Sequence, residues 1–226
     1  MKKIFIVANW KSNKTIKETE EWLHDFNEGL KAINLANDKQ IVLAPSFTSL
    51  EHAKYCLGNL KLPISLSSQN ISPYEKGPYT GEVAGSQIKE FAEYAIVGHS
   101  ERRKYFFEQE DMINKKIDQA IQNNLIPILC ISDIKQIQSL KLENNNMIIA
   151  CEPLFAIGTG NPDTPENANN VGKNIKEILG TVSVLYGGSI TSINVNSFTQ
   201  MPNIDGVLVG GSSLNPQEFL EIVKNA

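Results

Sequence analysis

The sequence predicts an α/β fold in which eight parallel β-strands alternate with helices and close into a (β/α)8 barrel. Nearly unbroken apolar runs, rich in Ile and Val, recur at residues 4–7, 41–44, 64–66, 95–97, 126–131, 147–151, 182–185 and 207–209. Such runs are typical of strands buried on both faces, whereas half-exposed antiparallel strands alternate. A repeat of about 28 residues over the 226-residue chain favours a closed barrel over an open doubly wound sheet, which usually has fewer strands.

The first strand follows a short basic start that imitates a secretory signal. Met1 and two lysines precede an apolar run at 4–8, which is too short for the apolar region of a signal peptide and ends in Asn9, Trp10 and Lys11. We therefore expect a β-strand here and no signal peptide.

Helical periodicity separates the runs. The segment 15–30 places apolar side chains near one side, and the segments 112–121 and 219–223 repeat that spacing. The fifth unit is weak, because residues 132–146 leave room for only a short helix before a polar turn. No linker interrupts the pattern, so we expect one barrel domain over residues 1–226, shortened around its fifth and sixth helices.

Composition excludes several classes of protein. With 41% hydrophobic residues the chain can bury a substantial core, which excludes a disordered tail. Its 21 basic and 25 acidic residues give a net charge of -4, without the basic excess expected of a partner for nucleic acid or anionic membrane. No apolar stretch approaches the length of a membrane-spanning helix, about 20 residues. Cys56, Cys130 and Cys151 show no CxxC spacing, which indicates reduced core thiols in a cytoplasmic protein.

Polar residues gather directly after the predicted strands. In a (β/α)8 barrel the carboxyl ends of the strands carry the chemistry. Each polar residue alone has an ordinary structural interpretation, such as a solvated lysine, a hydrogen-bonded histidine or a glycine in a tight turn. Together on one face they indicate a functional site: Asn9 and Lys11 after the first strand, His99, Ser100 and Glu101 after the fourth, Glu152 after the sixth, Gly187, Gly188 and Ser189 after the seventh, and Gly210, Gly211 and Ser212 after the eighth.

The glycine pairs predict a phosphate site. Barrels of this kind often hold a phosphate after strands seven and eight with backbone N–H groups and a helix N-terminus, and glycine lets the backbone come close. The glycine-rich loop 156–160 would be a third contributor. The expected ligand is therefore a small phosphorylated molecule.

Glu152, His99 and Lys11 suit proton transfer next to a carbonyl group. A carboxylate base can remove a carbon-bound proton there only if the resulting enediolate is stabilised, and a neutral imidazole with a cation can supply that. The sequence shows no Cys or Ser nucleophile with an adjacent base, no ligands at metal spacing and no GxGxxG at a helix start. We expect neither a metal nor a cofactor.

Seven ordered motifs resemble the triosephosphate isomerase family over most of the chain. They are ANWKSN at 8–13, SQN at 68–70, YTGEV at 79–83, VGHSERR at 97–103, EPLFAIGTG at 152–160, YGGSI at 186–190 and LVGGSSL at 208–214. VGHSERR and the EPLFAIGTG segment are highly specific, whereas YGGS and LVGG suit several phosphate-binding barrels. The resemblance implies a TIM barrel.

What the resemblance implies for function is interconversion of dihydroxyacetone phosphate and D-glyceraldehyde 3-phosphate in glycolysis and gluconeogenesis. Glu152 is similar to the family's base, His99 to its neutral electrophile, Lys11 to the cation near the enediolate, and Asn9 to its polar neighbour. Ser100 is a plausible N-cap of a short helix. Glu101 is equally compatible with a structural ion pair and with a catalytic role.

The same resemblance implies a lid and a phosphate cradle. The segment 153–160 is similar to the family's lid, in which the amide of Gly158 binds the phosphate. Gly188, Ser189, Gly210 and Gly211 would complete the cradle.

The resemblance also implies an assembly. The loop 70–81 would enter a neighbouring subunit, with Thr80 supporting the partner subunit's lysine. We expect a homodimer, with a tetramer as the alternative.

Three departures affect the scaffold. Cys151, Phe155 and Asn161 stand where the family usually has Tyr, Trp and Lys. None is a chemical group of the expected mechanism.

Two rival interpretations are another phosphate-binding barrel, such as an indoleglycerol or ribose phosphate enzyme, and a barrel that binds phosphates without turnover. The joint presence of the four site residues Asn9, Lys11, His99 and Glu152 disfavours both.

Overall fold

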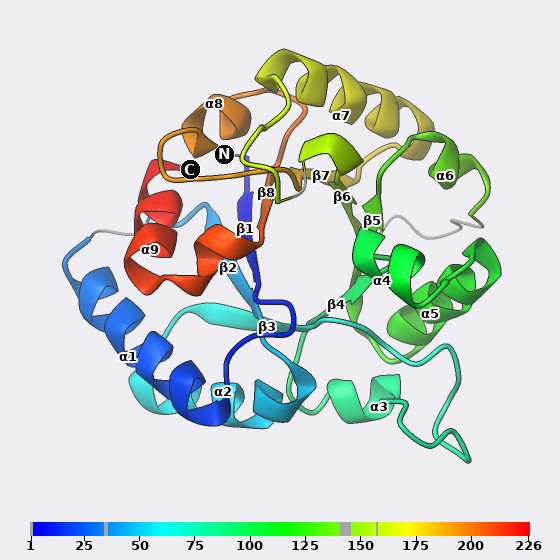
Figure 1. The fold of residues 1–226 in the computed structure, drawn as a ribbon, viewed down its shortest axis with the longest axis horizontal. Helices are drawn as coiled ribbons and strands as arrows, with labels where there is room; N and C mark the ends of the chain where they lie inside the picture. Colours follow the sequence, from blue (N-terminus) through cyan, green and yellow to red (C-terminus); the bar gives the residue numbers. More distant parts are fainter. Residues whose placement is uncertain (1, 34–35, 141–145, 157) are drawn as a thin grey trace.

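Eight parallel strands pair in chain order and close into a barrel, with the helices arranged around it (Figure 1). The structure is a computed structural model that describes residues 2–33, 36–140, 146–156 and 158–226. The strands are β1 (Ile4–Asn9), β2 (Lys39–Ala44), β3 (Ile64–Ser68), β4 (Tyr94–Val97), β5 (Ile126–Ile131), β6 (Ile148–Cys151), β7 (Ser183–Tyr186) and β8 (Gly206–Val209). The predicted (β/α)8 barrel is confirmed.

The closure of the barrel depends on β1, which pairs with a strand on each side. Ile6 is in register with Ile41 of β2, and Phe5 is in register with Gly206 of β8. Because every pairing is parallel, the carboxyl ends of all eight strands meet at one mouth of the barrel.

The helices follow the strands around the outside. They are α1 (Ile16–Lys31), α2 (Phe47–Leu60), α3 (Gly85–Ile88), α4 (Ser100–Tyr105), α5 (Glu110–Gln122), α6 (Lys135–Gln138), α7 (Pro165–Leu179), α8 (Val195–Thr199) and α9 (Pro216–Asn225), with the 3-10 turns η1 (Leu154–Ala156) and η2 (Gly211–Leu214). Local sequence explains where the long helices begin. A capping box of Thr15 and Glu18 starts α1, for example, by satisfying two backbone N–H groups reciprocally.

The expected shortening is found in the fifth unit and not in the sixth. The helix after β5, α6, has 4 residues. Of the expected polar turn 144–146, the first two residues belong to the segment 141–145, which lies outside the described residues. The helix after β6, α7, has 15 residues, because Thr164 caps it, Pro165 occupies its first turn and an apolar face packs on the barrel. Short helices occur instead after β3 and β7, where α3 has 4 residues and α8 has 5.

Alternate side chains along a strand can enter two different apolar clusters, as β1 shows. In β1, Phe5 and Val7 belong to the cluster that fills the barrel. Ile6 belongs to the outer cluster, together with Trp22 and Phe26 of α1. This period of two residues determines which side chains reach the interior of the mouth where a strand ends.

The three cysteines are free in the structure. Cys56 and Cys130 are buried and Cys151 is partly exposed. Within the described ranges, no helix is long and apolar enough to cross a membrane.

Candidate active site

The alternation of inward-facing and outward-facing residues along the strands places four residues at the mouth of the barrel. Each lies two positions beyond a side chain of the interior cluster, and therefore faces inwards where its strand ends. The four positions are Asn9 beyond Val7, Glu152 beyond Ala150, Gly187 beyond Leu185 and Gly210 beyond Leu208.

Lys11 is held at the mouth of the barrel in a backbone conformation that residues other than glycine rarely adopt. Its φ is 54°, in the left-handed region. Its N–H donates to Oδ1 of Asn9 at 3.0 Å, and its carbonyl accepts from Nε2 of Gln69 at 2.8 Å. The buried Trp10 anchors the same turn by donating from Nε1 to the carbonyl of Ser213 at 3.2 Å. The backbone of Lys11 is thus fixed on both sides while its ammonium reaches the cavity.

His99 occupies the N-cap position of α4. Its Nδ1 accepts the backbone N–H of Glu101 at 3.2 Å. Ser100, which the sequence predicted as the N-cap, is instead the first residue of the helix. Gly98 has a φ of 67°, which turns the chain after β4 so that the imidazole reaches the N–H of Glu101, the second residue of the helix. The N-terminus of α4 thus faces the imidazole.

Glu152 lies against the imidazole. Its Oε1 is 3.1 Å from Nε2 of His99, and its Oε2 accepts the backbone N–H of Ser100 at 3.5 Å. The carboxylate is buried, with the residue 3% exposed. Gly187 makes this position possible, since a Cβ there would lie 2.7 Å from Cγ of Glu152.

Lys11 and Glu101 form an ion pair. The ammonium contacts Oε1 of Glu101, while Oε2 of the same carboxylate lies 3.7 Å from Nδ1 of His99. Glu101 thus contacts both the lysine and the histidine, which is the structural ion pair that was one of its two predicted roles.

One cavity of about 250 Å³ collects the predicted substrate-facing residues. It is lined by Asn9, Lys11, His99, Glu152, Gly158, Gly188, Ser189, Gly210 and Gly211, among others. Two of the predicted supporting residues contact residues that line the cavity: Glu101 contacts Lys11 and His99, and the Ser100 N–H donates to Glu152. Thr80 is exposed in the loop after β3 and does not line the cavity.

The loop after β6 is tied to the loop after β7. Ser189 accepts the N–H of Gly160 at 3.2 Å and donates its hydroxyl to the carbonyl of Ala156 at 2.7 Å. Gly158 has a φ of 66°, a conformation that glycine adopts without a steric penalty. Leu154 and Phe155, at the start of the segment, are 67% and 61% exposed.

Neither cysteine near the cavity is a reactive thiolate. Burial, together with the adjacent carboxylate of Glu152, raises the pKa of the Cys151 thiol to about 12. Burial also raises the pKa of Cys130 well above its usual value. Both thiols are therefore protonated at neutral pH.

Gln69 is a site residue that the sequence reasoning quoted in a motif without assigning it a role. Its Nε2 donates to the carbonyls of Lys11 and Ala44, both at 2.8 Å, and so joins the ends of β1 and β2. The signal that could have identified it is its position, since it directly follows β3.

The fold and this cavity define a (β/α)8 barrel enzyme whose site lies at the carboxyl ends of its strands. The sequence pattern of the family described as triosephosphate isomerase matches residues 4–226. The chain therefore belongs to the triosephosphate isomerase family, an enzyme family of glycolysis.

Individual relatives agree with this assignment. The chain is 39% identical to a triosephosphate isomerase of Dictyoglomus turgidum, with all of both chains covered. It is 40% identical to one of Thermodesulfovibrio yellowstonii, over 99% of this chain and 100% of the relative. A third, from Mesomycoplasma hyopneumoniae, is 38% identical over the full length of both. These alignments span 248 to 254 positions against 226 residues here, so they contain gaps within this chain.

Proposed function

We propose that the protein interconverts dihydroxyacetone phosphate and D-glyceraldehyde 3-phosphate through an enediolate, as a cytoplasmic enzyme of glycolysis and gluconeogenesis built as one barrel domain. The observation that carries the proposal is the contact of 3.1 Å between the Glu152 carboxylate and Nε2 of His99, in a cavity shared with Lys11 and the glycine-rich loops. A base, a hydrogen-bond donor and a cation thus face one space large enough for a small phosphorylated molecule.

Glu152 is the proposed base. Its carboxylate is buried beside the cavity, where Oε2 accepts the Ser100 N–H at 3.5 Å and Oε1 lies 3.1 Å from Nε2 of His99. A carboxylate at this position can turn towards a substrate carbon and remove the proton next to the carbonyl group. The same carboxyl group then returns the proton to the neighbouring carbon, while the hydroxyl proton moves from the oxygen of the first carbon to the oxygen of the second, and ketose is converted into aldose.

His99 is the proposed electrophile, in its neutral form. Because Nδ1 accepts the Glu101 N–H, it carries no proton, and the single proton of a neutral imidazole is on Nε2. That Nε2–H is directed at Glu152 in this structure and is available to the substrate oxygen that becomes negative in the enediolate.

Lys11 supplies the positive charge. Its ion pair with Glu101 holds the ammonium at the edge of the cavity. A cation there stabilises both the enediolate and the phosphate dianion of the substrate. Asn9 supports this position by fixing the backbone of Lys11.

The phosphate would bind among the loops after β6, β7 and β8. The 3-10 turn η2 begins at Gly211, and the first N–H groups of such a turn have no partner within it. Gly158, Gly188, Ser189 and Gly210 line the same cavity with little side-chain bulk. The segment 153–160 would act as a lid, because an enediolate exposed to water can eliminate its phosphate.

We expect 2-phosphoglycolate to stabilise the protein more than either triose phosphate or inorganic phosphate does. It carries a phosphate for the glycine loops and a planar carboxylate that resembles the enediolate. At about 100 times its dissociation constant it should add about 2.7 kcal/mol to the free energy of unfolding, which thermal unfolding can measure. Ribose 5-phosphate is the control for the rival phosphate-binding barrels. Stabilisation by ribose 5-phosphate that equals or exceeds that by phosphoglycolate would overturn the proposed substrate.

We further propose a homodimer, based on the loop 70–81. Its base is anchored, because the buried Lys116 donates to Oδ1 of Asn70 at 2.6 Å. Its tip is exposed and carries two stacked rings, Tyr74 and Tyr79, whose centroids are 4.3 Å apart. A fixed base and a preformed aromatic tip suit insertion into a second copy of the chain, where Thr80 would support the partner's lysine.

Light scattering should therefore give twice the mass of the chain, and the double variant Tyr74→Ser/Tyr79→Ser should shift the protein towards monomer and lower its turnover. Tyr55→Ser is the matched control, because Tyr55 is 65% exposed on α2. A fully active monomeric wild-type protein would refute the dimer, and four times the mass would indicate the tetramer instead.

A further inference from the structure

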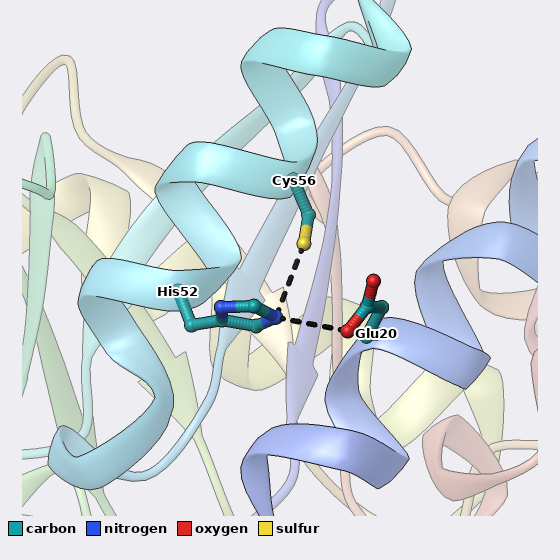
Figure 2. A group of neighbouring side chains, drawn as sticks. All are labelled: Glu20, His52 and Cys56. Carbon is teal, nitrogen blue, oxygen red and sulfur yellow. Dashed lines mark hydrogen bonds and ion pairs between the residues drawn. The ribbon is translucent and has the colours of Figure 1, made fainter.

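Three metal-ligating side chains converge on the outer surface of the barrel, where α1 and α2 lie side by side (Figures 1 and 2). Nε2 of His52 lies 3.4 Å from Sγ of Cys56 and 3.4 Å from Oε2 of Glu20. The three ligand atoms all lie within 4.8 Å of one another. No other group of three or more His, Cys, Asp or Glu side chains gathers this closely in the part of the chain that the structure describes.

The cluster corrects the expectation that the chain has no group of ligands at metal spacing. His52 and Cys56 are four residues apart on α2, so they share one face of the helix. Glu20 comes from the facing turn of α1 (Figure 2). Sequence spacing shows only the first two, because the third ligand arrives through the packing of two helices.

A nucleophilic cysteine is the first alternative, and the geometry disfavours it. In a Cys-His-acid arrangement the acid orients the imidazole through the nitrogen that does not face the nucleophile. Here both the sulfur and the carboxylate contact the same nitrogen, Nε2 (Figure 2). The second alternative is a purely local hydrogen bond, in which one Nε2–H is shared between Sγ of Cys56 and Oε2 of Glu20.

We propose that Glu20, His52 and Cys56 bind a zinc-like divalent transition-metal ion, with water as the fourth ligand. Tetrahedral zinc with ligands at about 2.0 to 2.3 Å places neighbouring ligand atoms about 3.3 to 3.6 Å apart, and the two distances of 3.4 Å lie within that range. The donor set of one sulfur, one nitrogen and one oxygen suits Zn²⁺, whereas Ca²⁺ and Mg²⁺ prefer oxygen alone.

The cluster is exposed on one side, so an ion can enter from solvent. The side chains of Glu20 and His52 are 51% and 28% exposed, while Cys56 is buried beneath them at 5%. The open side leaves room for a water ligand, and the buried side supplies the soft thiolate.

The bound ion would link the first two helices of the barrel. Because Glu20 belongs to α1 and the other two ligands to α2, unfolding of either helix would break the site. An ion that binds only the native state raises the stability of that state. None of the three residues lines the isomerase cavity, so turnover should not depend on the metal.

The test is a titration of the full chain, without an affinity tag and freed of metal with a chelator. Co²⁺ serves as the spectroscopic probe and Zn²⁺ as its competitor. We expect one ion per chain, an intense thiolate-to-cobalt charge-transfer band that Zn²⁺ abolishes, and a higher melting temperature with either metal.

Variants separate the metal site from a local hydrogen bond. Cys56→Ala should lose the charge-transfer band, and His52→Ala and Glu20→Gln should each weaken Zn²⁺ binding by about tenfold or more. His24→Ala is the matched control, since His24 is an exposed histidine of α1 outside the cluster, and it should bind as the wild type does. All four should keep wild-type turnover, which shows that they fold. Absence of saturable binding at micromolar metal, or equal binding by Glu20→Gln, His52→Ala and the wild type, would overturn the site.

Discussion

Glu152→Gln should lower turnover by about 10²- to 10⁴-fold, the range that a positioned acid or base contributes. The amide keeps the size of the side chain, and its one oxygen can still accept either the Ser100 N–H or the Nε2–H of His99, which contact different oxygens of Glu152. It cannot accept a carbon-bound proton. Affinity for phosphoglycolate should change much less than turnover, because the phosphate and the cation contacts remain.

Glu152→Asp tests position and not basicity. The shorter side chain keeps the carboxylate but retracts it by one methylene, and a misplacement of about 1 Å can cost on the order of 10²-fold. Steady-state kinetics in both directions provide the measurement, with Glu51→Gln, an exposed acid on α2, as the control. If both substitutions of Glu152 retain nearly normal turnover, Glu152 is not the base.

Lys11→Met should lower turnover and remove most of the preference for phosphoglycolate over inorganic phosphate. The ammonium is the cation that the carboxylate of the analogue would contact, and a hydrogen bond to a charged group contributes about 1.5 to 3 kcal/mol. The loss corresponds to roughly 10- to 150-fold in affinity. The substitution also removes the cation that pairs with Glu101. The unpaired carboxylate of Glu101 beside His99 would then repel the negative charge that develops in the cavity.

The control for Lys11→Met is Lys17→Met, because Lys17 is an exposed lysine whose ion pair with Glu21 lies on the surface of α1. Competition by phosphoglycolate and by phosphate in the isomerase assay gives both affinities. A Lys11→Met protein that still discriminates between the two ligands as the wild type does would show that the cation does not contact the carboxylate end.

Sequence patterns predicted the parts of the site that depend on strand register. Asn9 and Glu152 directly continue the inward alternation of β1 and β6, so a period of two residues suffices to place them. The orientation of His99 did not follow from that pattern, since Gly98 breaks the alternation with a positive φ and makes the imidazole itself the cap of α4.

Features that depend on packing between elements distant in the sequence were harder to predict from the sequence. The sequence contains Glu20, but only the approach of α1 to α2 brings it to His52 and Cys56. Helix lengths were predicted only in part, since α6 in the fifth unit is short as expected, whereas α7 in the sixth begins at a cap and a proline and has 15 residues. Periodicity locates an apolar face well, but it determines the end of a helix poorly.

Exchange of substrate hydrogen with solvent tests the proposed mechanism most directly. Triose phosphate incubated with the enzyme in D₂O and followed by NMR should gain deuterium at the carbon next to the carbonyl group, because the Glu152 carboxyl group exchanges its proton with solvent before returning it. Glu152→Gln at the same ligand occupancy should incorporate deuterium at least about 10²-fold more slowly. Rapid isomerisation by the wild type without any deuterium incorporation, or wild-type exchange by Glu152→Gln, would contradict an enediolate formed by this carboxylate.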